Sequence, residues 1–470
     1  MTTPDPVRHW ARRQPDAPAL VTPSETWSWS DLEARVAACA ARLGGLATGR
    51  LGVVARHQPD LVVLVLAALR ARRTLAPVST RWPAPMRAEA FDRLGVGAVA
   101  ADGAAPGTLR LRDLAAPGTS LDGPPADRID THYSFAILHT SGSTGAPKAV
   151  LQTWGQHVAS ARGLAARFPL GPGDRWLLDL PLYHVGGLAV VVRCALAGAT
   201  LALPDAGTGL ADTARQLAPT HASLVSTQLV RLLREDVDLA SLRVVLLGGS
   251  AFPPALLDAA VARGLPVVVG YGMTETTSTV TSSSLPVDRS ELATSGTALP
   301  GREVRVENGE VWVRGATLFE GYVEPQTVEP RTGGETLRRP LTPEGWFATG
   351  DRGTVDARGR LVVHGRIGNG FVSGGENVQP EAIEAALVAL PSVADAVVVP
   401  VPSPEYGARP VAFVRPAEGA LDPGALARAV RAALPGFMVP DAFYAWDGPA
   451  GLKPDRVGLA REAARRVGEG

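Results

Sequence analysis

The chain has 470 residues, of which 46% are apolar and 20% charged, and its 46 basic and 46 acidic residues give a formal net charge of zero. This is the composition of a folded protein with two to four domains of about 150 residues each.

The neutral charge argues against a nucleic-acid-binding surface. The longest strongly apolar run, Leu61–Leu69, is shorter than the roughly 20 residues that span a bilayer. The N-terminus lacks the apolar core of a signal peptide. Two cysteines, Cys39 and Cys194, are too few for a disulfide framework or a cysteine metal site. We therefore expect a cytoplasmic protein with no integral membrane segment and no nucleic-acid partner.

Helical and strand patterns alternate through the first 270 residues. A capping Ser30 with Glu33 three residues later predicts a helix over 30–43 that stops at Gly44 and Gly45. Residues 101–130, rich in Ala, Gly and Pro, are expected to form a surface segment without chemistry. The further predicted strands are 52–55, 135–139, 175–179, 200–203, 244–247 and 267–269, and the further predicted helices are 60–70, 156–168 and 188–197. Such alternation is typical of parallel sheets with helices on both faces.

The pattern changes after about Ser295. Short alternating strands over 303–306, 310–313 and 360–363 predict an antiparallel or barrel-like part. From Gly368 a compact unit follows, with helices over 380–389 and 423–433 and strands over 393–399 and 408–414. The predicted fold is α/β. A large N-terminal domain of doubly wound sheets with a small β-barrel-like part (1–366) is joined by a hinge to a small α+β C-terminal domain (367–470).

Lysine is almost absent from this chain. Of the 46 basic residues only Lys148 and Lys453 are lysines. Arginine serves equally well as a surface cation, whereas lysine is a compact point charge suited to phosphate. Either the two lysines remain by chance, or both positions need that geometry.

The strongest local signal is a loop directly after the predicted strand 135–139. It contains Thr140, Ser141, Gly142, Ser143, Thr144 and Gly145 and ends at Lys148. Glycines let the backbone approach a ligand, and successive N–H groups form a concave anion site. The pattern differs from the Walker A loop. A phosphate-binding loop and an ordinary surface turn both fit these residues.

Two further turns carry candidate ligand groups. Tyr271, between Gly270 and Gly272, can present its face to a planar base, and Glu275 can offer an oxygen to Mg²⁺. Asp351 is predicted on a tight turn, where its carboxylate could accept two hydrogen bonds from a ribose diol. Solvated turns without a ligand are the alternatives in both places.

Three stretches complete the series. Gly365, Gly368 and Gly370 lie at the predicted domain boundary, where they form either a hinge or a simple linker. The stretch 373–380 is expected to open a helix, and Lys453 lies on a loop near the C-terminus.

The ordered set of these stretches, from the N-terminus to Lys453, resembles the adenylate-forming superfamily of acyl- and aryl-CoA synthetases, luciferases and adenylation domains. The resemblance implies ATP, Mg²⁺ and coenzyme A as co-substrates and cofactors. It implies that 140–148 is the phosphate loop and that Tyr271, Gly272, Met273, Thr274 and Glu275 form the adenine and Mg²⁺ site. It further implies that Asp351 and Arg366 contact the ribose, that Gly368 is the hinge and that Lys453 is the catalytic lysine.

Within this superfamily the chain is most similar to the o-succinylbenzoate–CoA ligases of menaquinone biosynthesis. Four stretches carry the resemblance: 181–187, 220–225, 245–251 and 373–377. They add Gly249, Ser250, Ala251, Gly374 and Gly375 to the implied cofactor site. Catalytic roles are implied for His184, Thr144 and Glu275 besides Lys453.

The acyl substrate is suggested by a buried cation. Arg193 lies in an apolar helix among Val190, Val191, Val192 and Cys194, where an arginine without an anionic partner is costly. A protein carboxylate or a substrate carboxylate could supply that partner. The resemblance favours the substrate, since o-succinylbenzoate keeps a free aromatic carboxylate after activation. His184 and Ser223 are the other candidates for this pocket, and His184 can share it only if the helix starts near His184.

Two departures from the family pattern stand out. Gly368 occupies the hinge position that usually carries Asp or Lys, and Leu452 separates Gly451 from Lys453. Three alternatives remain open: a CoA synthetase for another acid, an adenylating enzyme that loads a carrier protein, and a catalytically silent nucleotide-binding protein. Small-molecule substrates are the expected partners, and a homo-oligomer is left open.

Overall fold

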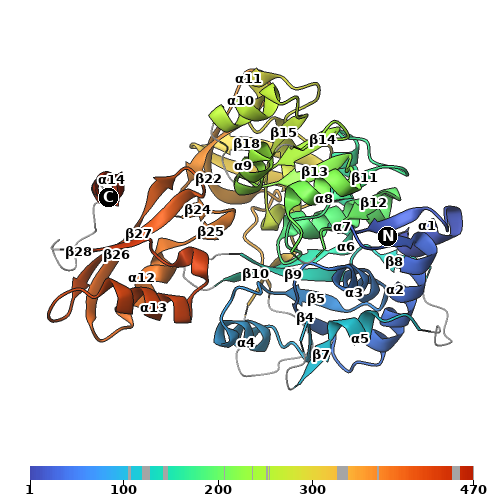
Figure 1. Ribbon diagram of the computed structural model, residues 1–470, viewed down its shortest axis with the longest axis horizontal. Helices are drawn as coiled ribbons and strands as arrows, with labels where there is room; N and C mark the ends of the chain where they lie inside the picture. The colour runs from blue at the N-terminus through green and yellow to red at the C-terminus, as the bar shows by residue number, and fades with distance from the viewer. Residues whose placement is uncertain are drawn as a thin grey trace.

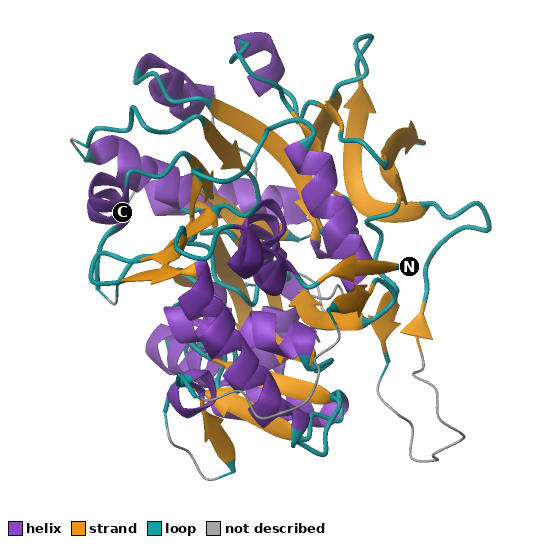
Figure 2. Cartoon of the chain, turned by 90° about the vertical axis from the view of Figure 1, so that its right-hand side faces the viewer, coloured by secondary structure: helices purple, strands orange, loops and turns teal. Residues whose placement is uncertain are grey.

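The computed structural model describes residues 1–103, 107–118, 127–140, 147–205, 207–235, 237–249, 252, 254–324, 337–367, 370–446 and 456–468. A large lobe holds two mixed sheets and a smaller antiparallel sheet, and a separate C-terminal unit lies beside it, drawn in orange and red (Figure 1). Helices cover the sheets of the large lobe (Figure 2). The predicted α/β class with a distinct C-terminal domain is confirmed.

The first sheet of the described chain has the strand order β21 (Leu337–Arg338), β20 (Gly321–Val323), β10 (Lys148–Thr153), β9 (Ser134–Thr140), β5 (Thr74–Pro77), β4 (Arg50–Val54), β6 (Ala98–Ala101) and β7 (Thr108–Arg110). The second has the order β17 (Thr297–Ala298), β16 (Ser278–Ser282), β15 (Val267–Met273), β14 (Val244–Leu247), β13 (His221–Leu224), β11 (Arg175–Leu177), β12 (Thr200–Ala202), β2 (Pro18–Val21) and β3 (Thr26–Ser28). Both are parallel in the middle. The first is antiparallel at the end that contains the β9–β10 pair, and the second is antiparallel at both ends, at β15–β16 and at β2–β3. β1 (Thr2–Pro4) pairs with β8 (Arg128–Asp130).

The helices of the large lobe are α1 (Pro6–Arg13), α2 (Trp29–Gly44), α3 (Pro59–Arg70), α4 (Ala84–Arg93), α5 (Leu111–Ala115), α6 (Trp154–Ala165), α7 (Val185–Ala197), α8 (Leu210–Leu217), α9 (Ser226–Arg234), α10 (Pro254–Ala262) and α11 (Arg289–Leu292). One apolar core joins the two large sheets through α2, α3, α6 and α7. Its largest fully buried side chains include Trp29, Phe135, Trp154 and Trp176. This core places α6 and α7 between the sheets (Figure 1).

The barrel-like part is a four-stranded antiparallel sheet of the described residues, in the order β18 (Arg302–Glu307), β19 (Glu310–Gly315), β22 (Phe347–Val355) and β23 (Leu361–Arg366). The C-terminal unit has its own sheet of β25 (Glu376–Val378), β24 (Phe371–Ser373), β27 (Gly407–Pro416), β26 (Val393–Ser403) and β28 (Ala442–Ala445). Its helices are α12 (Pro380–Val388), α13 (Pro423–Ala433) and α14 (Arg456–Gly468). Sheet membership changes between Arg366 and Phe371, and the domain boundary at 366/367 stays a prediction.

Two expectations for the N-terminal part were wrong in detail. The cap of α2 is Ser28, whose hydroxyl accepts from the Asp31 N–H in a capping box, so Ser30 lies inside the helix. Residues 101–130 are not merely a surface segment. They contribute β7, α5 and β8, and Leu111, Leu114 and Ile129 are buried in the core. A few apolar side chains suffice to bury such a segment despite its Ala, Gly and Pro content.

No helix in the described ranges is both long enough and apolar enough to cross a membrane.

Candidate active site

The predicted phosphate loop connects β9 to β10. Thr140 and Lys148 are cross-strand partners in this antiparallel pair, so the two ends of the loop lie next to each other in the sheet. The Oγ1 atom of Thr140 is buried, and the structure describes no hydrogen-bond partner for it. Ser141, Gly142, Ser143, Thr144 and Gly145 lie outside the described residues. What the structure places is therefore the base of the loop.

Glu275 lies close to Lys148 through a shared neighbour, Tyr322. The Tyr322 hydroxyl donates to Glu275 Oε1 at 2.9 Å, and Lys148 Nζ lies 5.3 Å from the centroid of the Tyr322 ring. Glu275 is in a 3₁₀ turn, Thr274–Thr276, directly after β15, and is only 8% exposed. The turn is anchored because Gln152 Nε2 donates to the Thr274 carbonyl at 2.6 Å. A lysine and a carboxylate thus contact the same tyrosine near the base of the loop.

The carboxylate of Glu275 suits a Mg²⁺ ion that is bound to the phosphates of a nucleotide. Mg²⁺ is typically held by one or two carboxylates together with substrate phosphate oxygens. Within the described ranges no group of three or more His, Cys, Asp or Glu side chains could hold an ion alone. Glu275 by itself therefore suits a nucleotide-bound cation better than a resident one.

Tyr271 and Asp351 also meet, but not on turns as expected. Tyr271 lies in β15, which continues past Val269 as the antiparallel partner of β16, and Asp351 lies in β22. The Tyr271 hydroxyl donates to Asp351 Oδ2 at 2.7 Å, and Asp351 is 7% exposed. Asp351 is the cross-strand partner of Arg366, whose side chain lies outside the description. The predicted turns were wrong because hydrogen bonding to β16 and β23 extends both strands through their glycines.

Arg193 lies at the other end of the site, on α7. It is 3% exposed, its NH2 group donates to Ser278 Oγ at 3.1 Å, and its guanidinium lies 5.3 Å from the Trp176 ring centroid. Trp176 Nε1 donates in turn to Ser223 Oγ at 3.2 Å. Arg193 and Ser223, both predicted for the acyl pocket, therefore surround the same tryptophan.

The charge of Arg193 is poorly compensated. In the part of the chain that the structure describes, no carboxylate forms an ion pair with it, and its Nε atom has no hydrogen-bond partner. Burial lowers the pKa of Arg193 to about 9, and the nearby charge of Arg302 acts in the same direction. A buried guanidinium held only by a hydroxyl and an aromatic ring is a site prepared for an anion.

The segment that contacts Arg193 also has an unusual backbone conformation. Thr277 and Ser278 have φ angles of +48° and +81°, a region that residues with side chains rarely adopt, and both are buried. The Thr276 hydroxyl donates to the Ser278 carbonyl at 2.8 Å. Backbone of this kind persists where the surrounding contacts fix it, commonly at functional sites.

His184 contacts the C-terminal unit rather than Arg193. It is the N-cap of α7, so the helix does start near His184 as the shared pocket required. Its Nε2 atom lies 3.0 Å from Glu376 Oε1, and Arg81 NH1 lies 3.8 Å from the same oxygen. Although burial opposes it, the hydrogen bond and charge of His184 lower the pKa of Glu376 below its ordinary value. Nine residues of helix rise by about 13.5 Å, so His184 and Arg193 act at different ends of α7.

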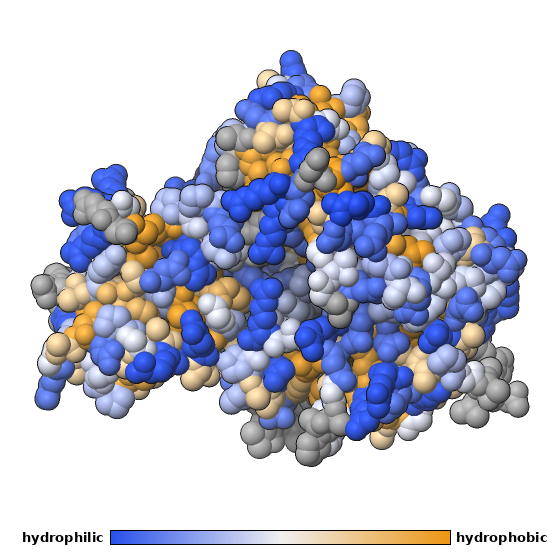
Figure 3. Space-filling view, viewed as in Figure 1, coloured by the Kyte–Doolittle hydropathy of each residue, from blue (hydrophilic) through white to orange (hydrophobic). Residues whose placement is uncertain are grey.

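Glu376 is presented by a hairpin that the sequence did not predict, just before the predicted helix. β24 and β25 are joined by Gly374 and Gly375, with φ angles of +59° and +85°. Positive φ angles at both positions of a two-residue turn favour glycine, and α12 begins at Pro380, as predicted. A Cβ atom on Gly375 would lie 3.5 Å from Val225 of the large lobe. The hairpin thus docks beside Gly249, where an added Cβ atom would also lie 3.5 Å from Val225. In Figure 3 the surface between the C-terminal unit and the large lobe is hollowed and largely hydrophilic.

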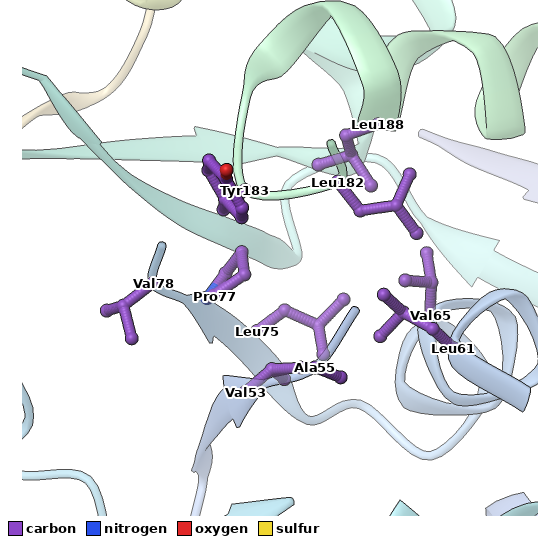
Figure 4. A pocket seen from close by; sticks show the side chains of 10 residues that line it. All are labelled: Val53, Ala55, Leu61, Val65, Leu75, Pro77, Val78, Leu182, Tyr183 and Leu188. Carbon is purple, nitrogen blue, oxygen red and sulfur yellow. The ribbon is translucent and has the colours of Figure 1, made fainter. Parts of the chain in front are cut away.

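The loop that carries His184 is fixed by an apolar seam. Leu182, Tyr183 and Leu188 point toward side chains of β4, β5 and α3 (Figure 4). The space left between them is only about 10 Å³, barely enough for one water molecule. This seam positions His184 and holds no ligand.

The described residues do not include four further predicted site residues: Ser250, Ala251, Gly368 and Lys453. Nearby, Ile367 N donates to the Gly350 carbonyl at 2.6 Å, and Arg456 pairs with Glu384 at 2.6 Å.

Sequence reasoning missed four residues that the site uses: Tyr322, Trp176, Ser278 and Arg81. Only Ser278 had a signal, since it follows the 270–277 stretch directly. The other three are brought in from distant segments by the fold.

Comparison with known proteins agrees with this geometry. The family of AMP-binding enzymes matches residues 7–323, and the AMP-binding enzyme C-terminal domain matches residues 382–449. The 2-succinylbenzoate–CoA ligase of Salmonella typhimurium is 36% identical over 479 aligned residues, covering 98% of this chain and 97% of that protein. The enzyme of the same name from Escherichia coli is also 36% identical, with the same coverage.

Solved structures of these enzymes have the same fold. A double mutant of the Bacillus subtilis o-succinylbenzoate CoA synthetase, bound to its product analogue OSB-NCoA, superposes with a TM-score of 0.88 at 25% identity, covering 98% of this chain and 99% of that chain. The same enzyme with the acyl-adenylate intermediate OSB-AMP gives 0.71, also at 25% identity and with 98% of both chains covered. The predicted resemblance to the adenylate-forming superfamily and its o-succinylbenzoate–CoA ligases is confirmed, and the chain belongs to the family of AMP-binding enzymes.

Proposed function

We propose that this chain is an AMP-forming o-succinylbenzoate–CoA ligase acting in menaquinone biosynthesis. It activates the succinyl carboxylate of o-succinylbenzoate with ATP, releases pyrophosphate, and transfers the acyl group to coenzyme A with release of AMP. The observation that carries the choice of substrate is Arg193, which is buried without a carboxylate partner in the described chain.

In the first step the substrate carboxylate attacks the α-phosphorus of ATP in line. Carboxylate is a weak nucleophile, so catalysis rests on positioning and on neutralising phosphoryl charge. Lys148 and the loop after Thr140 would hold the phosphates, Glu275 would hold the Mg²⁺ that neutralises them, and Lys453 would complete the set. Tyr271 and Asp351 would hold the adenine and ribose.

At the acyl end the free aromatic carboxylate would reach Arg193. That pairing would compensate the buried guanidinium, which lies beside the Trp176 ring. Amino-acid substrates are disfavoured, since their ammonium group would meet a cation at this position.

The second step is supported by the position of the C-terminal unit. Against one Bacillus subtilis enzyme, the structure superposes better on the product-analogue complex than on the acyl-adenylate complex, with TM-scores of 0.88 and 0.71. Sequence identity is 25% in both comparisons, and a difference in domain arrangement would account for the two scores. The His184–Glu376 contact would then belong to the thioester-forming arrangement, and rotation about Gly368 would separate the two residues.

The decisive experiment measures coenzyme A-dependent AMP release with ATP and Mg²⁺. O-succinylbenzoate is compared with benzoate, short fatty acids and amino acids. A strong preference for o-succinylbenzoate is expected. Activity on another acid alone would contradict the role of Arg193 while leaving the two-step reaction in place. Acyl-adenylate formation without thioester formation would favour the carrier-protein alternative.

A further inference from the structure

A second cavity is lined in part by Arg193. It encloses about 290 Å³ between the N-terminal segment, α6, the stretch 168–176 and α7. These elements are neighbours near the N-terminus in Figure 1. Its volume is close to that of the smaller ligand pockets of proteins, about 300 Å³. Among the residues proposed for catalysis or substrate binding, only Arg193 and its neighbour Trp176 also line it.

The lining is positively charged. Arg193, Arg162 and His9 line the cavity, and among its described lining residues there is no Asp or Glu. Arg193 is 3% exposed, and its Nε atom has no partner among the described residues. Arg162 is exposed on α6, and the described chain offers it no ion pair. An anion entering the cavity would therefore meet one buried and one exposed guanidinium.

The remaining walls are aromatic and held in place. Trp10, Phe168 and Trp176 line the cavity together with aliphatic side chains. Trp10 is fixed because its Nε1 atom donates to the Leu196 carbonyl at 3.4 Å, and Trp176 stacks on His221 with ring centroids 5.1 Å apart. Rigid aromatic walls favour a planar ring as the occupant.

We propose that this cavity, the α1–α6–α7 cavity, binds a small planar aromatic carboxylate. The ring lies among Trp10, Phe168 and Trp176, and the carboxylate pairs with Arg162 and Arg193. Because Arg193 would also serve the substrate in the proposed function, an occupant here lowers the affinity of the enzyme for its acid substrate. The binding itself does not depend on which acid the enzyme activates.

Calorimetric titration of the full-length enzyme with 1-naphthoate tests this proposal. Ala165→Trp fills the cavity from α6, and Arg162→Ala removes the outer guanidinium. The matched control is Ala166→Trp, which adds the same side chain at the next position, an exposed residue outside the lining. We expect 1-naphthoate to bind about tenfold more weakly to each of the first two variants and unchanged to the control.

Equal affinity in wild type, Arg162→Ala and Ala165→Trp would overturn the proposal, since the probe would then occupy the catalytic pocket. Absence of binding to the wild-type enzyme would overturn it as well. Arg162→Ala keeps the test decisive if Ala165→Trp fails to fold. The outcome is separable from the proposed function, because neither Ala165 nor Arg162 belongs to the catalytic site and o-succinylbenzoate-dependent AMP release is measured on the same variants.

Discussion

The two ends of the site treat their charges in opposite ways. At the nucleotide end each described carboxylate already accepts a hydrogen bond from a tyrosine, Tyr322 for Glu275 and Tyr271 for Asp351. At the acyl end Arg193 is buried with a hydroxyl and an aromatic ring but no described carboxylate. The nucleotide end is therefore organised before its ligand arrives, whereas the acyl end depends on its ligand for charge compensation. We infer that the first end serves the reaction common to the family and the second selects the acid.

The largest effect is expected from Lys453→Ala. If Lys453 neutralises phosphoryl charge, its loss should slow adenylation by about 10³-fold, while thioester formation from supplied acyl-adenylate continues. Pyrophosphate release and thioester formation are measured separately. An equal fall in both half-reactions would refute this division of labour.

A comparison of Arg193→Met with Glu275→Gln separates the two ends. Arg193→Met should reduce kcat/KM for o-succinylbenzoate by about 10²-fold and spare poor monoacid substrates. Glu275→Gln should reduce adenylation of every acid by one common factor, because it acts on the nucleotide. The measurement is AMP release across the same set of acids. Uniform loss with Arg193→Met would remove the distinction between the two ends.

Glu376→Gln should act on the second step alone. Loss of the negative charge opposite His184 and Arg81 should weaken docking of the hairpin and slow thioester formation by about tenfold. Adenylation should stay unchanged, since this contact belongs to the other arrangement. Glu418→Gln, an exposed position of the same unit, is the matched control. A slower adenylation step in Glu376→Gln would contradict the assignment.

Acid should destabilise the protein through two buried histidines. His157 and His221 are each 1% exposed, and burial lowers their pKa values to about 3 and about 4. They stay neutral in the folded protein, so stability is full above the ordinary pKa of 6.5 and falls as the pH drops below it, by about 1.4 kcal/mol per pH unit for each histidine. Urea unfolding at pH 7, 6 and 5, followed by tryptophan fluorescence, measures this loss. Equal stability at the three pH values would show that these histidines are not shielded.

The smallest effect concerns stability of the unliganded enzyme. At pH 7 the guanidinium of Arg193 carries its charge below its lowered pKa of about 9, so the cost of burying that charge is fully present. Arg193→Met should therefore raise the melting temperature by about 1–3 °C, although it impairs activity. Thermal melts without substrate measure the change. A lower melting temperature would mean that contacts within the protein already compensate Arg193.

These two ends also differ in how far the sequence could predict them. Glu275 and Lys148 lie in contiguous stretches whose residue types suggest phosphate chemistry, so both were predicted as site residues. Their connection through Tyr322 was not, because β20 reaches β10 only through sheet pairing across more than 170 residues. Asp351 was found as a carboxylate but placed on a turn, since glycine-rich strands resemble turns in sequence. Arg193 was predicted as a site residue because a charged side chain within an apolar helix needs an anionic partner.

Secondary structure, too, was predicted well where the sequence has a local pattern and missed where it has none. Strands with regular apolar patterns, such as β14 at Val244–Leu247, were predicted with the right bounds. The helix predicted from residue 380 is confirmed by α12, but the hairpin before it was missed, because two glycines with positive φ angles between short strands leave almost no periodic signal. The contact of Glu376 with His184 spans 192 residues of sequence and depends on domain placement, which no local pattern encodes.

The scarcity of lysine has a consequence for self-modification. An acyl-adenylate is a mixed anhydride, and any neutral amine that attacks its carbonyl carbon forms an amide and expels AMP. Arginine stays protonated and hydrogen-bonded, so it is a poor nucleophile under these conditions. The described lysine, Lys148, keeps its ammonium against the Tyr322 ring. With only Lys148 and Lys453 as side-chain amines, the protein offers an escaped intermediate very few side chains to acylate.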